Sequence, residues 1–313
     1  MIQISFRDRV RQIIGSGVNR LLSHHARHQL ERWVLGISIF SYITHLSLIA
    51  LSAKGIIATP VGLLASPISA IYTPFSFILV YEVYLLIYYL PKSTSFYIGK
   101  QYEIITLIII RRIFKDIGNL QLVPNWFRNE NDLRFTYDAI SSLILFLLIC
   151  LFYMQVLQKG AQSDAAKEAT EKDESTFLTL KKGIAVLLVP IMLLLACYSF
   201  GNWIINLFQN YQSGIYSVIN LNQIFFDEFF TILIIVDVML LLASLFYSDQ
   251  FQSIMRNSGF VISTILIKLS FSVYGITNNL LIVGSVAFGL CVLLIFNLFS
   301  RKVAPLFPKE DSN

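Results

Sequence analysis

Long apolar runs separated by short polar stretches dominate the sequence. A transmembrane helix needs about 20 mainly apolar residues, and eight segments approach this length. They are Trp33–Ala53, Phe75–Leu90 (within Ile56–Leu90), Phe96–Phe114, Phe135–Leu157, Gly183–Phe208, Ile224–Tyr247, Gly259–Tyr274 and Asn279–Ser300. The third has a short apolar core, Ile104–Ile110, bracketed by charged residues. The pattern predicts an all-α polytopic membrane protein with about eight transmembrane helices.

Three polar segments organise these runs. Residues 1–32 form an N-terminal arm, residues 158–182 a linker and residues 301–313 a tail. The linker contains QKGAQSDAAKEATEKDES, which has too little apolar surface to form a core of its own. It separates two predicted units of four helices each, residues 33–157 and 183–300. Before the second run, Pro60, Pro67 and Pro74 predict an irregular external connection, with a broken helix and a re-entrant segment as the alternatives.

The composition supports the membrane class. Hydrophobic residues make up 56% of the chain and charged residues 14%, whereas soluble proteins carry about 25% charged residues. A soluble domain of this size cannot bury so large an apolar fraction. The composition therefore excludes an ordinary soluble enzyme, a disordered chain and a nucleic-acid-binding protein.

The net charge of +5 is concentrated in the N-terminal arm. An apolar stripe between Phe6 and Leu21 has helical spacing, and arginines flank it, as in a helix that lies in the membrane surface. A cytoplasmic helix packed on the bundle fits this pattern equally well. The arginines expected to contact anionic lipid headgroups are Arg7, Arg9, Arg11, Arg20 and Arg27.

The distribution of basic residues predicts the orientation. With the arm inside, eight spans return the C-terminus to the same side. Segments 158–182, 248–258 and 301–313 are then internal and contain lysines and arginines, whereas segments 210–223 and 275–278 are external and uncharged. This agrees with the positive-inside rule. We therefore expect a bacterial inner (plasma) membrane protein with both termini in the cytoplasm.

The two predicted units resemble one another. Phe75–Ile87 can be laid on Phe230–Leu242 at an offset of 155, which superposes Glu82 on Asp237. Further on, an offset of 157 superposes Arg111 on Lys268. An acid and a base thus come into register in both units. This predicts a tandem duplication, with the units related by an axis along the membrane normal.

Charges inside the apolar runs are the candidate functional residues. A charged side chain near the centre of a transmembrane helix costs about 2.5–3.5 kcal/mol, so it is kept where it pairs, faces a wet cavity or has a function. Counted from the inner ends of their runs, Asp237 and Lys268 lie at one depth, about 15 Å from the surface. We expect them to pair, and we expect Glu82 to pair with Arg111 or Arg112. The alternative is that such pairs only hold helices together.

No pattern indicates catalysis or metal binding. The sequence contains no P-loop, no GxSxG, no HExxH and no GxGxxG after a strand. His24 and His28 lie one helical turn apart, and we expect them on a solvated basic face. Cys150, Cys197 and Cys291 fall in separate apolar runs without ligand spacing. We expect no catalytic residue, no metal and no cofactor.

An acid in the second span of a unit and a base in the third resembles a known family. Asp237, Arg256 and the segment Gly259-Phe-Val-Ile-Ser-Thr-Ile-Leu-Ile-Lys268 are similar to the phosphate-starvation-inducible E (PsiE) family of small bacterial membrane proteins, as are Glu82 and Arg111. The similarity covers about half of the chain. The sequence departs from the family in its tandem form, its lysine at position 268 and its long basic arm. The resemblance implies architecture more than function.

Two functional hypotheses follow. In the first, the protein handles ions or protons, and its intramembrane charge pairs gate or relay protons or small cations along a narrow polar path. In the second, it is a non-catalytic membrane scaffold or stress-response partner protein, whose charge pairs are structural and whose basic arm is a docking surface. A homo-oligomer is compatible with the predicted architecture, and an enzyme is not expected.

Overall fold

The computed structural model describes residues 15–17, 20–55, 67–117, 129–163, 177–195, 198, 221–247 and 251–302. Every regular element in these ranges is helical, which confirms the all-α class for this part of the chain. The labelled elements are α2 (His24–Ala53), η2 (Pro67–Ile71), α3 (Tyr72–Tyr89), α4 (Thr94–Ile117), α5 (Glu130–Ser163), α7 (Leu221–Tyr247), α8 (Phe251–Ser270) and α9 (Ile276–Lys302). A further helix, Phe177–Leu195, lies between α5 and α7 in the sequence.

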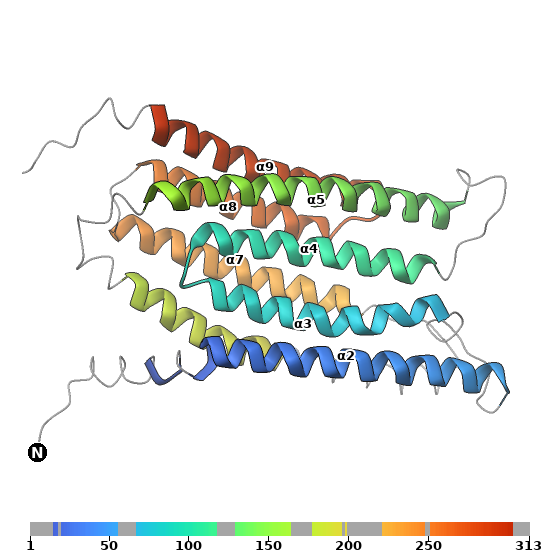
Figure 1. Ribbon diagram of the computed structural model, residues 1–313. Coiled ribbons are helices and arrows are strands. Elements are labelled where there is room, and N and C mark those ends of the chain that lie inside the picture. Colours follow the sequence, from blue (N-terminus) through green and yellow to red (C-terminus); the bar gives the residue numbers. More distant parts are fainter. Residues whose placement is uncertain are drawn as a thin grey trace, which may run out of the picture.

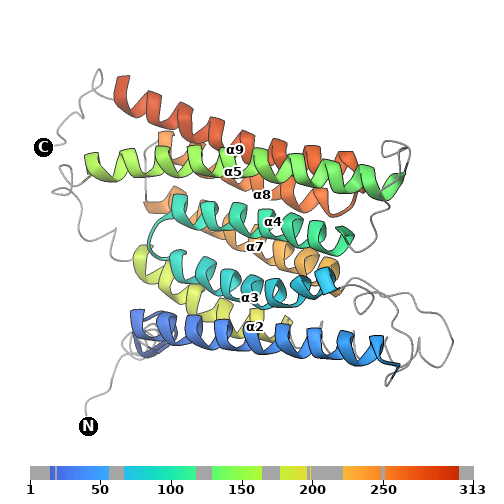
Figure 2. The same ribbon diagram turned by 45° about the vertical axis from the view of Figure 1, so that its right-hand side comes forward.

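The long helices lie side by side and run in alternating directions (Figures 1 and 2). At one end of the bundle, which we call the near end, α2 begins, α9 ends and a short turn joins α3 to α4 (Figure 1). At the opposite end, the far end, α4 ends, α5 begins and residues 271–275 join α8 to α9. Gly275 in that turn has a φ of 66°, a left-handed conformation that favours glycine.

The outer surface of the bundle is apolar. Five helices are long and apolar enough to cross a membrane by length and composition: His24–Ala53, Asp132–Leu157, Phe177–Leu195, Phe226–Leu245 and Ile276–Ser300. Large hydrophobic side chains are exposed along them, including Phe40 on α2 and Leu143 on α5, 73% and 70% exposed. So much exposed apolar surface marks contact with lipid rather than water. The protein is therefore an α-helical integral membrane protein.

Two helices with many polar residues, α4 and α8, each pack against three other helices of the bundle. Helix α4 packs against α3, α5 and α8, and α8 packs against α7, α9 and α4. The hydroxyl of Tyr102 in α4 also packs closely against α9, because a Cβ at Gly289 of α9 would lie 1.7 Å from it. Lipid supplies no hydrophobic drive for helices to associate, so small residues that permit close packing matter more here than in water. Shielding by neighbours explains why α4 tolerates six charged residues.

The helix boundaries correct several sequence expectations. Helix α8 begins at Phe251 rather than Gly259 and ends at Ser270, and α4 begins at Thr94 rather than Phe96. Helix α2 begins at His24, so it includes the end of the predicted arm. Of the three prolines expected in an irregular connection, Pro67 opens η2, Pro74 lies in the first turn of α3, where proline is tolerated, and Pro60 lies outside the described residues. The remaining differences are at helix ends, where polar residues continue an apolar helix.

Candidate functional site

Asp237 of α7 is buried where α4, α7 and α8 meet, and it is 6% exposed. Gln101 of α4 donates through Nε2 to Asp237 Oδ2 at 3.1 Å, and Thr264 Oγ1 of α8 lies 3.0 Å from the same oxygen. Thr264 Oγ1 is also 2.8 Å from Gln101 Oε1. Three helices thus contribute one residue each to a closed polar cluster, which we call the aspartate cluster. No lysine, arginine or histidine in the described part of the chain forms an ion pair with Asp237.

A small cavity reaches Asp237 from the near end. Its volume is about 20 Å³, and Thr94, Phe177 and Asn257 line it together with Asp237. This is room for about one water molecule. Tyr97, 1% exposed, lies beside Asp237. The cavity therefore gives the carboxyl group a polar neighbourhood on its near-end side.

A second acidic cluster lies on another face of α4. Lys100, which precedes Gln101, has its Nζ 3.6 Å from Glu82 Oε2 of α3 and 2.5 Å from Glu103 Oε2. Tyr153 of α5 donates to Glu103 Oε1 at 2.5 Å. Two acids share one lysine here, and the side chains of Glu82 and Lys100 are only 14% and 15% exposed. Consecutive residues of α4 thus contact the two acids, Glu82 and Asp237, that the sequence alignment of the units superposes.

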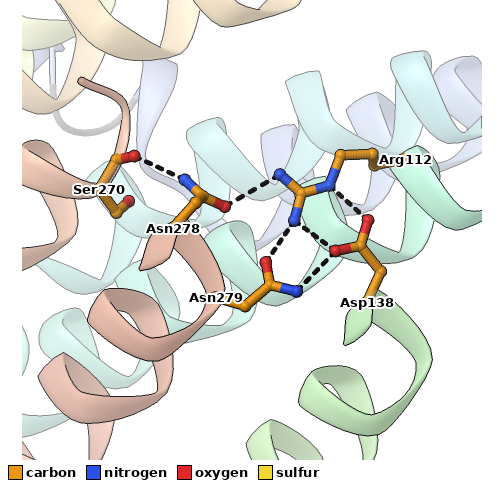
Figure 3. Close-up of polar contacts among 5 residues, drawn as sticks. All are labelled: Arg112, Asp138, Ser270, Asn278 and Asn279. Carbon is orange, nitrogen blue, oxygen red and sulfur yellow. Dashed lines mark hydrogen bonds and ion pairs between the residues drawn. The ribbon is translucent and has the colours of Figure 1, made fainter. Parts of the chain in front are cut away.

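Arg112 organises a polar network at the far end (Figure 3). Its Nε and Nη2 donate to the two carboxylate oxygens of Asp138 at 2.5 and 2.6 Å. The same guanidinium donates to Asn278 Oδ1 at 2.9 Å and to Asn279 Oδ1 at 2.5 Å. Asn279 donates in turn to Asp138 Oδ1 at 2.7 Å, and Asn278 to the carbonyl of Ser270 at 2.6 Å. Bidentate geometry and amide donors satisfy an aspartate whose side chain is 4% exposed.

A cavity of about 260 Å³ adjoins this network and is called the far-end cavity. Its polar lining residues are Arg111, Arg112, Asp116, Arg134, Tyr137, Asp138, Tyr274, Asn278 and Asn279. Its apolar lining residues are Ile105, Ile108, Ile109, Phe271, Val273 and Ile282. Tyr274 is 76% exposed, so the cavity reaches the surface of the protein.

Isoleucines separate the far-end cavity from the aspartate cluster. Ile105 lies seven residues before Arg112 on α4, so the cavity reaches about 10 Å from Arg112 toward the near end along that helix. Gln101 is one helical turn beyond Ile105, about 6 Å further. Ile105 and Ile109 are fully buried. Asp237 therefore lies between a small cavity toward the near end and a larger one toward the far end, with a thin apolar barrier on the far-end side.

The charge pairs expected from the sequence are wrong, because the structure gives each acid or base a different partner. Lys268 pairs with Asp227 of α7 rather than Asp237, and its Nζ also donates to the backbone carbonyl of Asp227 at 3.1 Å. Glu82 pairs with Lys100 rather than Arg111 or Arg112. Arg111 instead donates to Ser76 Oγ at 3.4 Å, and its guanidinium lies 5.7 Å from the ring centre of Phe226.

Both wrong pairings have the same cause, which is the distance of each charged residue from the near end. This distance was taken from the first apolar position of each run, but α4 and α8 begin earlier, with polar turns inside the bundle. Lys268 is seventeen residues beyond the start of α8, and Asp227 is twenty before the end of α7, so both lie about 25–30 Å from the near end. Lys100 is six residues into α4, and Glu82 seven before the end of α3. In both cases the acid and the base that pair lie at a similar distance from the near end.

The predicted membrane-surface arginines are only partly described. Arg7, Arg9 and Arg11 lie outside the described residues. Arg20 is exposed. Arg27 lies over the ring of Tyr88, 5.5 Å from its centre, and donates to the Tyr89 hydroxyl at 3.5 Å. Arg27 therefore contributes to the packing of α2 on α3 at the near end.

Sequence reasoning missed the neutral members of these clusters. Gln101, Thr264, Asn278 and Asn279 are buried polar residues in or beside apolar helices. Isolated amides and hydroxyls carry no charge, so they stood out less than the acids and bases. Asp138 did offer a signal, because it lies inside the predicted span Phe135–Leu157. An acid in a span calls for a partner, and Arg112 is that partner.

Comparison with family models, with curated proteins and with solved structures finds no match.

Proposed function

We propose that this chain is a bacterial inner-membrane protein of eight spans, arranged as two four-helix units with cytoplasmic termini, that handles protons or small cations at Asp237. The near end is then the cytoplasmic end. The alternating directions of α2 to α5 and of the helices from Phe177 to Lys302 support the arrangement (Figure 1). The presence of one acid, Glu82 or Asp237, in the second span of each unit also supports a PsiE-like architecture for each unit.

The observation that carries the functional proposal is the uncompensated position of Asp237. A carboxylate kept only to hold helices together is best balanced by a cation, because an ionised acid inside the membrane costs about 2.5–3.5 kcal/mol. Asp237 is instead bound by an amide and a hydroxyl, which support either its neutral or its charged form. A side chain that accepts and releases a proton or a cation needs this tolerance.

The geometry around Thr264 accommodates both protonation states of Asp237. Thr264 Oγ1 has one hydrogen and lies near three oxygens: Gln101 Oε1 at 2.8 Å, Asp237 Oδ2 at 3.0 Å and the Phe260 carbonyl at 3.1 Å. Its hydrogen is donated to Asp237 when the carboxylate is charged, and to the amide or the carbonyl when Asp237 carries a proton of its own. In the second case the hydroxyl accepts the proton of Asp237. The contact between α7 and α8 is therefore kept in either state.

Flux measurements on the full chain in liposomes test the proposal. Wild-type protein is expected to move protons or small cations above the level of empty vesicles under a pH gradient or a membrane potential. Asp237→Asn is expected to reduce this flux to background. Glu228→Gln is the matched control, because Glu228 is an exposed acid on the same helix, and it is expected to keep the flux. Absence of flux from the wild-type protein under every gradient contradicts the proposal.

The scaffold hypothesis has an observation of its own. The Arg112–Asp138 pair is bidentate and is completed by two asparagines, which is typical of a structural contact. If the protein is a scaffold, Asp237→Asn is expected to leave assembly unchanged. Neither the wild-type protein nor this variant is then expected to move protons or cations. Disruption of the far-end network would then be the change that abolishes its role.

A further inference from the structure

The lining of the far-end cavity combines two kinds of side chain. Arginines, tyrosines and asparagines supply polar groups, and isoleucines with Phe271 and Val273 supply apolar surface. Arginines outnumber aspartates by one among the lining residues, so the lining carries one excess positive charge. We propose that this cavity binds a small organic monocarboxylate with an apolar body. Its carboxylate faces the arginine side, and its body lies on the isoleucine floor.

The charge count favours a monoanion. Arg112 and Asp138 neutralise one another in the bidentate pair of Figure 3. The balance on the lining then rests on Arg111, Arg134 and Asp116. One carboxylate brings the lining to neutrality, whereas a dianion would leave an excess negative charge beside buried Asp138. A cation would add to the existing positive charge.

The size and surface of the cavity favour a compact organic body. A volume of about 260 Å³ is many times the roughly 10–15 Å³ that one water molecule needs. The cavity therefore has room for a ring-shaped or branched acid of about nine non-hydrogen atoms. Isoleucines of the lining provide apolar contact, and its polar groups fix the orientation, as in ligand pockets generally.

The preorganised wall supports binding rather than simple packing. Asn278 and Asn279 are held by Ser270, Asp138 and Arg112, so they do not need to rearrange to admit a ligand. Arg134 is 57% exposed and forms an ion pair at 3.6 Å with Glu130, which is 87% exposed, so water weakens this pair and leaves the guanidinium accessible to a ligand. The binding site is independent of the proposed role of Asp237, because it concerns occupancy of the cavity and not proton movement.

Calorimetric titration of benzoate into the full chain in nanodiscs tests the site, with empty nanodiscs as the blank. A ligand of this size is expected to bind with a dissociation constant of about 1 mM or below. Benzamide has the same shape without the charge, and its affinity is expected to be at least about tenfold lower.

Three variants locate the binding. Ile108→Trp fills the cavity and is expected to abolish benzoate binding. Arg134→Gln removes a rim charge and is expected to weaken binding about fivefold, as for a partly exposed charge. Ile140→Trp is the matched control on the exposed face of α5, outside the cavity lining, and is expected to bind as wild type.

Several results would overturn the site. No saturable benzoate heat up to about 20 mM, far above the expected dissociation constant, excludes it. Equal affinity for benzamide excludes the charge argument, and unchanged binding by Ile108→Trp places the ligand elsewhere. If Ile108→Trp fails to assemble, Arg134→Gln on the exposed rim decides, because unaltered affinity in that variant contradicts the proposal.

Discussion

Glu82 and Asp237 are acids at corresponding sequence positions, yet they are stabilised in different ways. Glu82 has a lysine 3.6 Å away, and that lysine also serves Glu103. Asp237 has an amide and a hydroxyl instead. Both acids contact α4, at the consecutive residues Lys100 and Gln101. A difference of one residue on α4 therefore separates an acid paired with a cation from an acid bound by neutral groups.

The difference teaches where function is to be sought in this bundle. An ion pair inside a membrane protein makes its charge state a condition of stability, since removing one partner leaves the other uncompensated. A neutral cluster does not impose that condition. The paired sites at Glu82, Arg112 and Lys268 are thus suited to holding helices together, and the aspartate cluster is suited to change.

The largest expected effect comes from removing the shared cation. Lys100→Met leaves Glu82 and Glu103 near one another without a positive charge, and we expect a loss of about 3 kcal/mol in the free energy of unfolding. Unfolding in dodecyl sulfate, followed by circular dichroism, measures this loss. The double variant Lys100→Met/Glu82→Gln is expected to recover about half of it. A single variant as stable as wild type would show that the cluster is not structural.

A second prediction gives Asp237 the kind of partner that Glu82 has. In Gln101→Lys, an ammonium group beside Asp237 holds the carboxylate in its ionised form. We expect proton flux in liposomes to fall at least about tenfold, equivalent to about 1.4 kcal/mol, while assembly is retained. Gln101→Glu is the contrasting variant, because it adds an acid in place of a cation and cannot form the pair. Full flux in Gln101→Lys would contradict the need for a neutral cluster.

Much of the fold followed from the sequence, and the reason is physical. Apolar runs long enough to cross a membrane are dictated by the bilayer, so the helical membrane class and the approximate positions of the long apolar helices are readable without a structure. The polar ends of these helices cannot be read from the sequence in the same way, because burial inside a bundle permits polar turns within the membrane. Helix α8 shows this well, since Phe251–Ser258 continues the helix before its apolar part begins.

The candidate site was predictable only in its charged members. Asp237 was identified because one acid in an apolar run is conspicuous. Its partners lie 136 and 27 residues away along the chain, so no local pattern connects them. Asp138 and Arg112 were both visible as charges, but their pairing depends on how α5 packs against α4. Contacts between helices are the part of the site that requires the three-dimensional structure.

A third prediction concerns the hydroxyl of the aspartate cluster. Thr264→Val keeps the shape and removes one hydrogen-bonding group, so we expect a loss of about 0.6–1 kcal/mol in the free energy of unfolding. Thr264→Ser keeps the hydroxyl and is expected to restore proton flux that Thr264→Val reduces. Equal flux in the two variants would remove Thr264 from the proton path, whatever their stabilities.

The smallest expected effect tests the pair that the sequence assigned to the wrong acid. The side chains of Lys268 and Asp227 are 25% and 40% exposed, and partly solvated pairs contribute little. Lys268→Met is therefore expected to change the free energy of unfolding by less than about 1 kcal/mol and to leave proton flux near that of wild type. If Lys268 acted on Asp237 instead, the same variant would abolish or greatly alter flux. Lys268→Met and Gln101→Lys together compare a cation at the far end with a cation at the aspartate cluster. Only the cation at the aspartate cluster is expected to stop proton movement.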